Sequence, residues 1–425
     1  MELWILVLTL VVTLAIGLPL PICLAGASLA GLLAMGDMPL GIIPQRFVAG
    51  INSFAFMAIP FFLLVGQIMN QSGITRRIID FSNALVGPMP GGLAQVNVVS
   101  SMFFGGISGS ATADTASIGS IMIPAMKQEG YSGPFTVALT ACSSTCGPII
   151  PPSITLILYG IIAEVSITQL FLGGYIPGLM LGLGLLVMSY VISKRRGYPT
   201  HARPSLRELL RATLAASWAL FLPFLIIGGL LGGLFTVTEA AAVAVVYALF
   251  VGLFVYRDLK ITDLPRILFV TAVRVGSLMT VAAGALVFAW VLTILEVPQT
   301  VAEWIFAFST DKIVILLLIN VLFLVIGMFM EAKAAMLILL PVILPVLPEV
   351  GIDPIHFGVV VVFNLLVGLV TPPVGLCLNL AAKIGDVPLN RAAVASLPFI
   401  AVQLVVLILI TYIPGLVLWL PGLVR

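Results

Sequence analysis

The sequence predicts an all-α polytopic membrane protein whose two halves form an inverted repeat. Of its 425 residues, 61% are hydrophobic and 8% are charged, whereas about a quarter of the residues in an ordinary soluble domain are charged. Apolar runs near or above the ~20 residues that a helix needs to cross a bilayer recur along the chain. Because helices satisfy their own backbone hydrogen bonds in lipid, we expect the spanning segments to be helices.

One pattern of glycines and prolines occurs twice. It begins with GGISGSATADTASIGSIMIPAMKQEG in the first half and with GMFMEAKAAMLILLPVILPVLPEVG in the second. Helix-breaking residues in one register indicate a duplicated pair of broken helices, which in so apolar a chain is typical of a secondary transporter that binds its solute near mid-membrane. A shift of 221 positions superposes, without a gap, Gly106 on Gly327, Pro124 on Pro345, Gly130 on Gly351, Gly147 on Gly368, and Pro151-Pro152 on Pro372-Pro373.

Residues 1–86 are expected to form scaffold helices and an arm at the membrane interface. Pro19 and Pro21 separate two short apolar segments, each barely long enough to span, and we expect two crossings there. A third crossing and an interfacial helix follow. These elements are predicted at Leu3–Leu18, Pro21–Met35, Ile51–Gln71 and Ile78–Val86.

Residues 87–165 form the predicted first transport unit. The segments Leu93–Phe104 and Ala113–Met126 are too short to span comfortably, and the Gly/Ser-rich stretch between them predicts a re-entrant hairpin. A broken helix follows at Pro134–Ala163. It is interrupted at Gly147-Pro148 and again at Pro151-Pro152, because proline removes a backbone donor and frees an upstream carbonyl.

The remaining segments complete the scaffold and repeat the first unit. Residues 166–311 are expected to form scaffold helices, a basic linker at 194–211 and a second interfacial arm. Residues 312–385 repeat the hairpin and the broken helix, and residues 386–425 form a C-terminal helix. Crossings in these parts are predicted at Thr168–Ile192, Leu214–Leu231, Thr236–Tyr256, Val275–Leu295 and Ala393–Leu420.

Charge predicts the orientation of the two units, because cytoplasmic loops collect Lys and Arg. If the linker at 194–211 is cytoplasmic, the number of crossings places Lys127 and Arg257 on the same side. Glu303 and Glu349 then lie outside. The first hairpin therefore enters the membrane from the cytoplasm and the second from the opposite face, which predicts an inverted repeat.

The tip of the first hairpin carries small and polar residues at membrane depth. Two interpretations remain open: a packing surface that lets helices approach closely, or unwound backbone and hydroxyls that offer hard oxygen ligands to Na+. Asp114 either holds the tip or lends charge to a cation site. The candidates are Ser108, Ser110, Thr112 and Asp114 at the tip, and Ser144, Gly147, Pro151 and Pro152 at the facing break.

The second tip contains two ionisable residues, Glu331 and Lys333, which are functional candidates because charged side chains are costly in a membrane. As residues two apart on one helix, they are expected not to face each other, and structural and solute-binding roles both remain open. An organic anion would find helix N-termini and hydroxyls between the two tips. The set is completed by Gly327, Asn364, Gly368, Thr371, Pro372 and Pro373.

Several function classes find no support in the sequence. It has no GxxxxGK[ST] nucleotide-binding motif, no basic cluster suited to nucleic acid, and two histidines, both expected near a membrane surface. The four cysteines lie in apolar segments, where thiols pack as small hydrophobes. We therefore predict no catalytic residues, no organic cofactor and no transition metal, and a membrane-embedded enzyme is disfavoured.

Three motifs resemble the large membrane subunit of tripartite ATP-independent periplasmic (TRAP) transporters: GGISGSATADTASIGSIMIPAMKQEGY, GPIIPPSI and GIDPIHFGVVVVFNLLVGLVTPPVGL. The likeness covers essentially the whole chain. It implies an elevator-type fold and Na+-driven import of organic acids across the bacterial inner membrane, with C4-dicarboxylates and sugar acids such as sialic acid both open. It also implies two partners, a small four-helix membrane subunit and a periplasmic solute-binding protein.

The resemblance further implies where Na+ binds, namely where each hairpin meets its broken helix. An independent elevator-type Na+/carboxylate symporter that needs no binding protein remains an alternative, because the duplication allows it equally. The implied Na+ sites map onto Ser108, Ser110, Gly147 and Ile150 in the first unit, and onto Gly327, Gly368 and Thr371 in the second.

Overall fold

The computed structural model describes residues 2–36 and 38–424, and every regular element in these ranges is helical. Several of the described helices are long and apolar enough to cross a membrane. The protein is therefore an all-α, multi-span membrane protein, as the sequence predicts. The candidate spans are Phe54–Gln71, Ile167–Arg196, Leu206–Leu231, Val237–Val255, Ile261–Ile294, Ala332–Val350 and Leu389–Tyr412.

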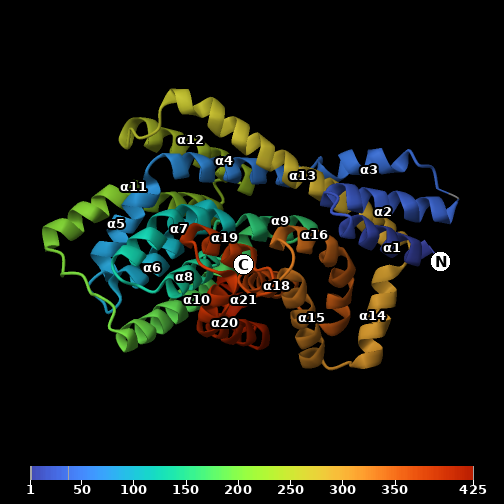
Figure 1. Ribbon diagram of the computed structural model, residues 1–425. Coiled ribbons are helices and arrows are strands. Elements are labelled where there is room, and N and C mark those ends of the chain that lie inside the picture. Colours follow the sequence, from blue (N-terminus) through green and yellow to red (C-terminus); the bar gives the residue numbers. More distant parts are fainter. Residues whose placement is uncertain (1, 37, 425) are drawn as a thin grey trace.

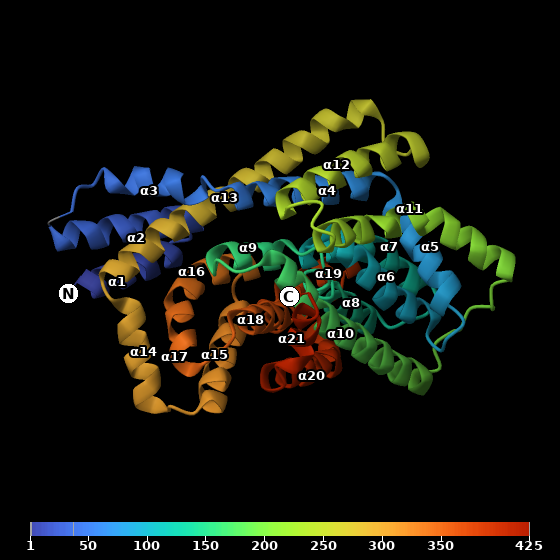
Figure 2. The ribbon, with the colours of Figure 1, turned by 180° about the vertical axis from the view of Figure 1, so that it is seen from behind.

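The N-terminal helices pack on longer helices from the middle of the chain. The elements are α1 (Glu2–Ala15), α2 (Leu20–Met35), α3 (Ile42–Ile51), η1 (Phe54–Met57), α4 (Ala58–Gln71), α12 (Val237–Phe250) and α13 (Leu264–Ile294). Helix α2 packs on α1 and α13, and α4 packs on α12 and α13. In Figures 1 and 2, α13 runs along the molecule from the end that carries α12 to the end that carries α1, α2 and α3.

The first unit consists of a helical hairpin and an interrupted helix. After α5 (Ile74–Val86), its elements are α6 (Gly92–Ser108), α7 (Ala111–Gln128), α8 (Gly133–Ser144) and α9 (Ile154–Ile162). Helices α6 and α7 pack against each other. Residues 145–152 between α8 and α9 are turns and bends, and Ser153 is the extended N-cap of α9, so the break falls where the glycines and prolines predict it.

The second unit repeats this order. After α14 (Val297–Phe308), its elements are α15 (Lys312–Gly327), α16 (Ala332–Ile343), η4 (Leu344–Val346), α17 (Leu347–Val350), α18 (Pro354–Gly368) and α19 (Leu376–Gly385). The shift of 221 positions that takes Ala111 to Ala332 also takes Gly133 to Pro354. The corresponding helices α7 and α16, and α8 and α18, thus begin in the same register.

The two units pack into each other. Helix α19 of the second unit packs on α7 and α8 of the first, and α9 of the first packs on α16 and α18 of the second. Figure 2 shows α9 beside α16. Because the half-helix after each break packs on the other unit, the two hairpins lie close together.

The other elements surround the two units. They are α10 (Ile167–Arg196), α11 (Leu206–Leu231), η2 (Val251–Val255), η3 (Ile261–Asp263), α20 (Leu389–Tyr412) and α21 (Gly415–Gly422). Helix α10 packs on α6, α20 and α21, whereas α11 packs on α5. The basic linker is therefore shorter than predicted, because α10 continues to Arg196 and a Ser205–Glu208 capping box starts α11.

Several predicted boundaries are wrong, among them the start of the interfacial helix α5, which lies at Ile74 and not at Ile78. The crossing expected from Ile51 starts later, because Ser53 is extended and separates α3 from η1 and α4. The crossing expected from Val275 starts at Leu264, since Pro265 fits the first turn of a helix. The final crossing ends at Tyr412, and Pro414, which cannot continue the hydrogen-bond ladder, precedes α21.

Candidate functional site

The first hairpin turns at Gly109 and Ser110. Gly109 has a φ of +58°, which an L side chain rarely adopts, and ends α6. Ser110 is the N-cap of α7, and its Oγ accepts a hydrogen bond from Ala113 N at 3.5 Å. The hydroxyls of Ser110 and Thr112 lie 3.2 Å apart. Two hydroxyls are thus held at the start of α7.

The first hairpin touches the first break through glycine backbones. A Cβ added to Gly105 would clash with the Cα of Gly147, so Gly105 needs to be glycine for this approach, whereas one added to Gly147 would lie 3.2 Å from the Cα of Gly105. One added to Gly109 would lie 3.0 Å from the carbonyl oxygen of Pro152. The peptide bond between Pro151 and Pro152 is cis.

The second hairpin and break make the corresponding contact. A Cβ added to Gly368 would lie 2.6 Å from the Cα of Gly327. The amide of Gly375 donates to the Met328 carbonyl at 3.3 Å, which ties the end of the break to the hairpin tip. Thr371 Oγ1 donates to the Val367 carbonyl at 2.7 Å, and the Pro372–Pro373 peptide bond is cis.

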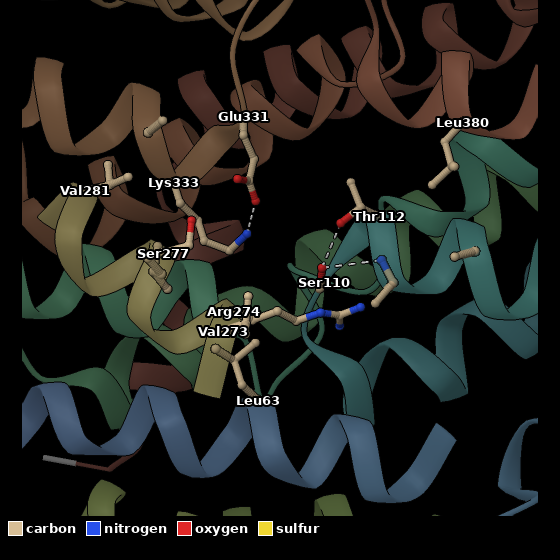
Figure 3. A pocket seen from close by; sticks show the side chains of 14 residues that line it. Leu63, Ser110, Thr112, Val273, Arg274, Ser277, Val281, Glu331, Lys333 and Leu380 are labelled. Carbon is tan, nitrogen blue, oxygen red and sulfur yellow. Dashed lines mark hydrogen bonds and ion pairs between the residues drawn. The ribbon is translucent and has the colours of Figure 1, made fainter. Parts of the chain in front are cut away.

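A cavity of about 590 Å³ lies where the two tips meet α13. Ser110 and Thr112 line it from the first tip, and Glu331 and Lys333 line it from the second (Figure 3). The same four residues also line a small adjoining cavity of about 10 Å³. Side chains that are more than 200 positions apart in the sequence therefore share one site.

Glu331 and Lys333 form an ion pair across the start of α16. The prediction that they do not face each other is wrong, because Glu331 has an extended backbone (ψ 140°) and precedes the helix. The side chain of Lys333 is 14% exposed and that of Glu331 is 43% exposed. Among the described residues no side chain caps α16, so its first backbone N–H groups, which belong to residues beside the cavity, carry partial positive charge.

The arrangement of hairpins, breaks and cavity can be compared with known proteins. A family model described as "Tripartite ATP-independent periplasmic transporter, DctM component" matches residues 7–416. The chain belongs to this DctM family. It is a transporter permease and not an enzyme, and the resemblance seen in the motifs is confirmed.

Named relatives of this DctM component span several solutes. This chain is 40% identical to the sialic acid TRAP transporter large permease protein SiaM of Vibrio cholerae, and the match covers 96% of this chain and 95% of that protein. The chain is 43% identical to the C4-dicarboxylate TRAP transporter large permease protein DctM of Pseudomonas aeruginosa, covering 87% and 86%. The isethionate TRAP transporter permease protein DctMQ of Oleidesulfovibrio alaskensis is 41% identical, but the chain spans only 65% of its length.

The fold resembles that of a solved transporter. The crystal structure of the Alcanivorax borkumensis YdaH transporter has a TM-score of 0.63 with this chain, at 15% identity, covering 91% of this chain and 89% of that one. At this identity the likeness shows the fold of the DctM component and nothing about its solute.

Several predicted residues lie behind the cavity rather than in its wall. Asp114 and Ser144 are fully buried, and Ser144 accepts a 2.7 Å hydrogen bond from Thr115. Among the described residues, Asp114 Oδ2 has no hydrogen-bond partner, and Oδ1 accepts a long 3.5 Å bond from Ser101. Asn364 is buried too and donates to Asn320.

The predicted Na+ ligands lie along the two hairpin–break contacts. Their hydroxyl and carbonyl oxygens are the hard donors that suit a group I or II cation. Within the described ranges, no three His, Cys, Asp or Glu residues cluster as a transition-metal site would require. The predicted Na+ ligands are Ser108, Ser110, Gly147 and Ile150 in the first unit and Gly327, Gly368 and Thr371 in the second, and the predicted solute-binding prolines Pro151, Pro152, Pro372 and Pro373 belong to the two breaks.

The wall of the cavity that α13 contributes was not predicted from the sequence. Arg274 and Ser277 line the cavity from this helix, and Figure 3 shows the Arg274 side chain extending into it. The prediction started this helix at Val275, one residue too late to include the arginine. The available signal was a lone basic residue within an apolar segment, which inside a membrane marks a functional candidate.

Proposed function

We propose that this DctM component is the large membrane subunit of a Na+-coupled importer of organic acids in the bacterial inner membrane. The observation that carries the proposal is the cavity shared by the two hairpin tips, with the Glu331–Lys333 pair on one side and the Ser110 and Thr112 hydroxyls on the other. Together with Arg274 in the same lining, this set of cation, hydroxyls and helix N-termini suits a carboxylate with polar substituents.

The solute class follows from this chemistry and from the relatives. The names of the relatives include C4-dicarboxylate, sialic acid and 2,3-diketo-L-gulonate, the last for the Escherichia coli permease YiaN. All three are organic acids. We assign the solute of this chain to the same class, a C4-dicarboxylate or a sugar acid such as sialic acid.

Na+ coupling is assigned to the hairpin–break contacts. The Ser108 and Ser110 hydroxyls with carbonyls near Gly147 and Ile150 form the first set, and the carbonyls near Gly327 and Gly368 with Thr371 form the second. Na+ held there would fix each tip against its break and add positive charge beside the solute. The solute would then bind best when Na+ is bound, which is the linkage that a symporter needs.

An elevator mechanism fits the packing of the two units. Because α19 packs on α7 and α8, and α9 packs on α16 and α18, residues 87–165 and 312–385 would move as one body. Residues 1–86 and 166–311 would form the scaffold, with the C-terminal helix of residues 386–425 beside it. In an inverted repeat, the hairpins would gate the site from opposite faces.

Two protein partners complete the proposal. The relative named DctMQ is longer than this chain, and we assign the additional length to a fused small subunit. A small four-helix subunit would assemble with this chain, and a periplasmic binding protein would deliver the solute. A permease that works alone is the competing arrangement.

Uptake into proteoliposomes tests the proposal. The chain would be reconstituted with and without its small subunit and binding protein, and uptake of radiolabelled succinate, sialic acid and gluconate would be measured with and without an inward Na+ gradient. We expect uptake of at least one acid that requires Na+ and both partners. Equal uptake without Na+ would refute the coupling, and full uptake by the chain alone would favour the independent symporter.

A further inference from the structure

The cavity has a third charged residue that no other side chain neutralises. Among the residues that line it, the charged ones are Arg274, Glu331 and Lys333, and the last two are paired. In the described part of the chain, Arg274 has no hydrogen bond, ion pair or ring contact. Its side chain is exposed to the cavity. The charged side chains of the lining therefore sum to one net positive charge, which favours the binding of an anion.

The position of Arg274 is set by a helix face. Ser277, Leu278 and Val281 also line the cavity, at the spacing of three, four and seven residues that places side chains on one face of a helix. This face belongs to α13, not to either hairpin. Arg274 lies in a helix long and apolar enough to cross a membrane, where a charged side chain is costly unless it meets an opposite charge or water, so an anionic solute in the cavity would stabilise it.

We propose that Arg274 binds the carboxylate of the solute and that the site selects an organic acid with one carboxylate and several hydroxyl groups over a dicarboxylate. The inference rests on the proposed function and narrows it. A guanidinium binds a carboxylate through two parallel hydrogen bonds. The Ser110, Thr112 and Ser277 hydroxyls and the Glu331 carboxylate would then meet the hydroxyl groups of the solute.

Among the described residues that line the cavity, no second unpaired cation is present for a second carboxylate of the solute. That carboxylate could form an ion pair only with Lys333, and Glu331 would then lose its partner and repel the solute as a like charge. Both steps cost free energy that a hydroxyl group in the same position would not. The charge of the lining thus favours a hydroxylated monoanion, and the volume of about 590 Å³ leaves room for a sugar acid.

Matched acids test the selection. D-gluconate and D-glucarate share a hydroxylated six-carbon chain but carry one and two carboxylates, and sorbitol carries none. Binding of each would be measured by isothermal titration in Na+ buffer to the purified chain with its small subunit. We expect gluconate to bind at least tenfold more tightly than glucarate, and sorbitol not to bind. Tighter binding of glucarate, or no binding of either acid, would overturn the inference.

Variants test the role of Arg274. We expect Arg274→Gln to weaken gluconate binding at least tenfold and Arg274→Lys to restore part of the loss. Arg266→Gln, on an exposed part of the same helix, should bind as the parent does. Parent-like gluconate binding by Arg274→Gln would overturn the inference. The proposed function would stand in each of these cases, because it fails only if no organic acid is taken up in response to Na+.

Discussion

Gly327 and Gly368 end α15 and α18, and their backbones meet so closely that a Cβ on Gly368 would lie 2.6 Å from the Cα of Gly327. Gly105 and Gly147 make the corresponding contact in the first unit. In each unit, a glycine near the end of the first hairpin helix thus lies on a glycine of the break. Carbonyls freed by the break therefore lie beside the hairpin tip, where the proposed Na+ sites are.

Adding a methyl group to the break glycine at either contact should impair transport. We expect Gly368→Ala to lower Na+-dependent uptake at least tenfold, because overpacking a tight contact costs about 1–3 kcal/mol and would push the hairpin away from the break. Gly147→Ala should act in the same direction with a smaller effect, since its nearest new contact is 3.2 Å. Uptake assays at matched expression check both variants.

Gly228→Ala is the matched control, because a Cβ there meets nothing within 4 Å. It should transport as the parent does. Parent-like uptake by Gly368→Ala would show that the close approach of the two glycines is not needed.

The ion pair at the second tip offers a test of its two open roles. Lys333→Gln should raise the KM for the solute about tenfold, which corresponds to about 1.4 kcal/mol, because Glu331 is left unpaired beside the cavity. If Lys333 contacts the solute, the double variant with Glu331→Gln should remain impaired. If the pair is only structural, the double variant should recover, since neither charge then lacks a partner.

Kinetics of the two single variants and the double variant would decide between these roles. Lys383→Gln, an exposed lysine on α19, serves as the control and should leave the KM unchanged. A normal KM in Lys333→Gln itself would remove this residue from both roles.

The Ser108→Ala substitution should weaken Na+ binding more than it weakens solute binding. The Ser108 hydroxyl has one hydrogen bond in the described chain, from Ser110 N at 3.4 Å, so Ser108→Ala should leave the hairpin folded. We expect the Na+ concentration for half-maximal uptake to rise several-fold, because one ligand is lost, while the KM at saturating Na+ changes little. Ser120→Ala, on an exposed part of α7, should change neither value.

The sequence predicted the hairpins and breaks well because local chemistry determines them. Proline removes a donor wherever it stands, and the duplicated register makes each break visible twice. The start of α16 at Ala332, in register with α7 at Ala111, follows from the same pattern. Helix ends without a strong breaker, such as the start of α13, were predicted less well.

Contacts between distant segments could not be predicted in the same way. The placement of Arg274 opposite the tips depends on how α13 crosses the molecule, which no local pattern encodes. The pairing of Glu331 with Lys333 depends on one backbone angle just before a helix. Likewise, Asp114 follows the first tip in sequence and Asn364 precedes the second break, but tertiary packing places both behind the cavity.

The central claim is that two equivalent hairpins enter the membrane from opposite faces. Gln128 and Glu349 occupy matching positions under the shift of 221 residues, and both are exposed. The four native cysteines are buried, so a cysteine introduced at either site can be labelled selectively. In spheroplasts treated with a membrane-impermeant maleimide, we predict that Glu349→Cys is labelled at once and Gln128→Cys only after the inner membrane is opened. Labelling of both from the same side would contradict the inverted repeat and the account built on it.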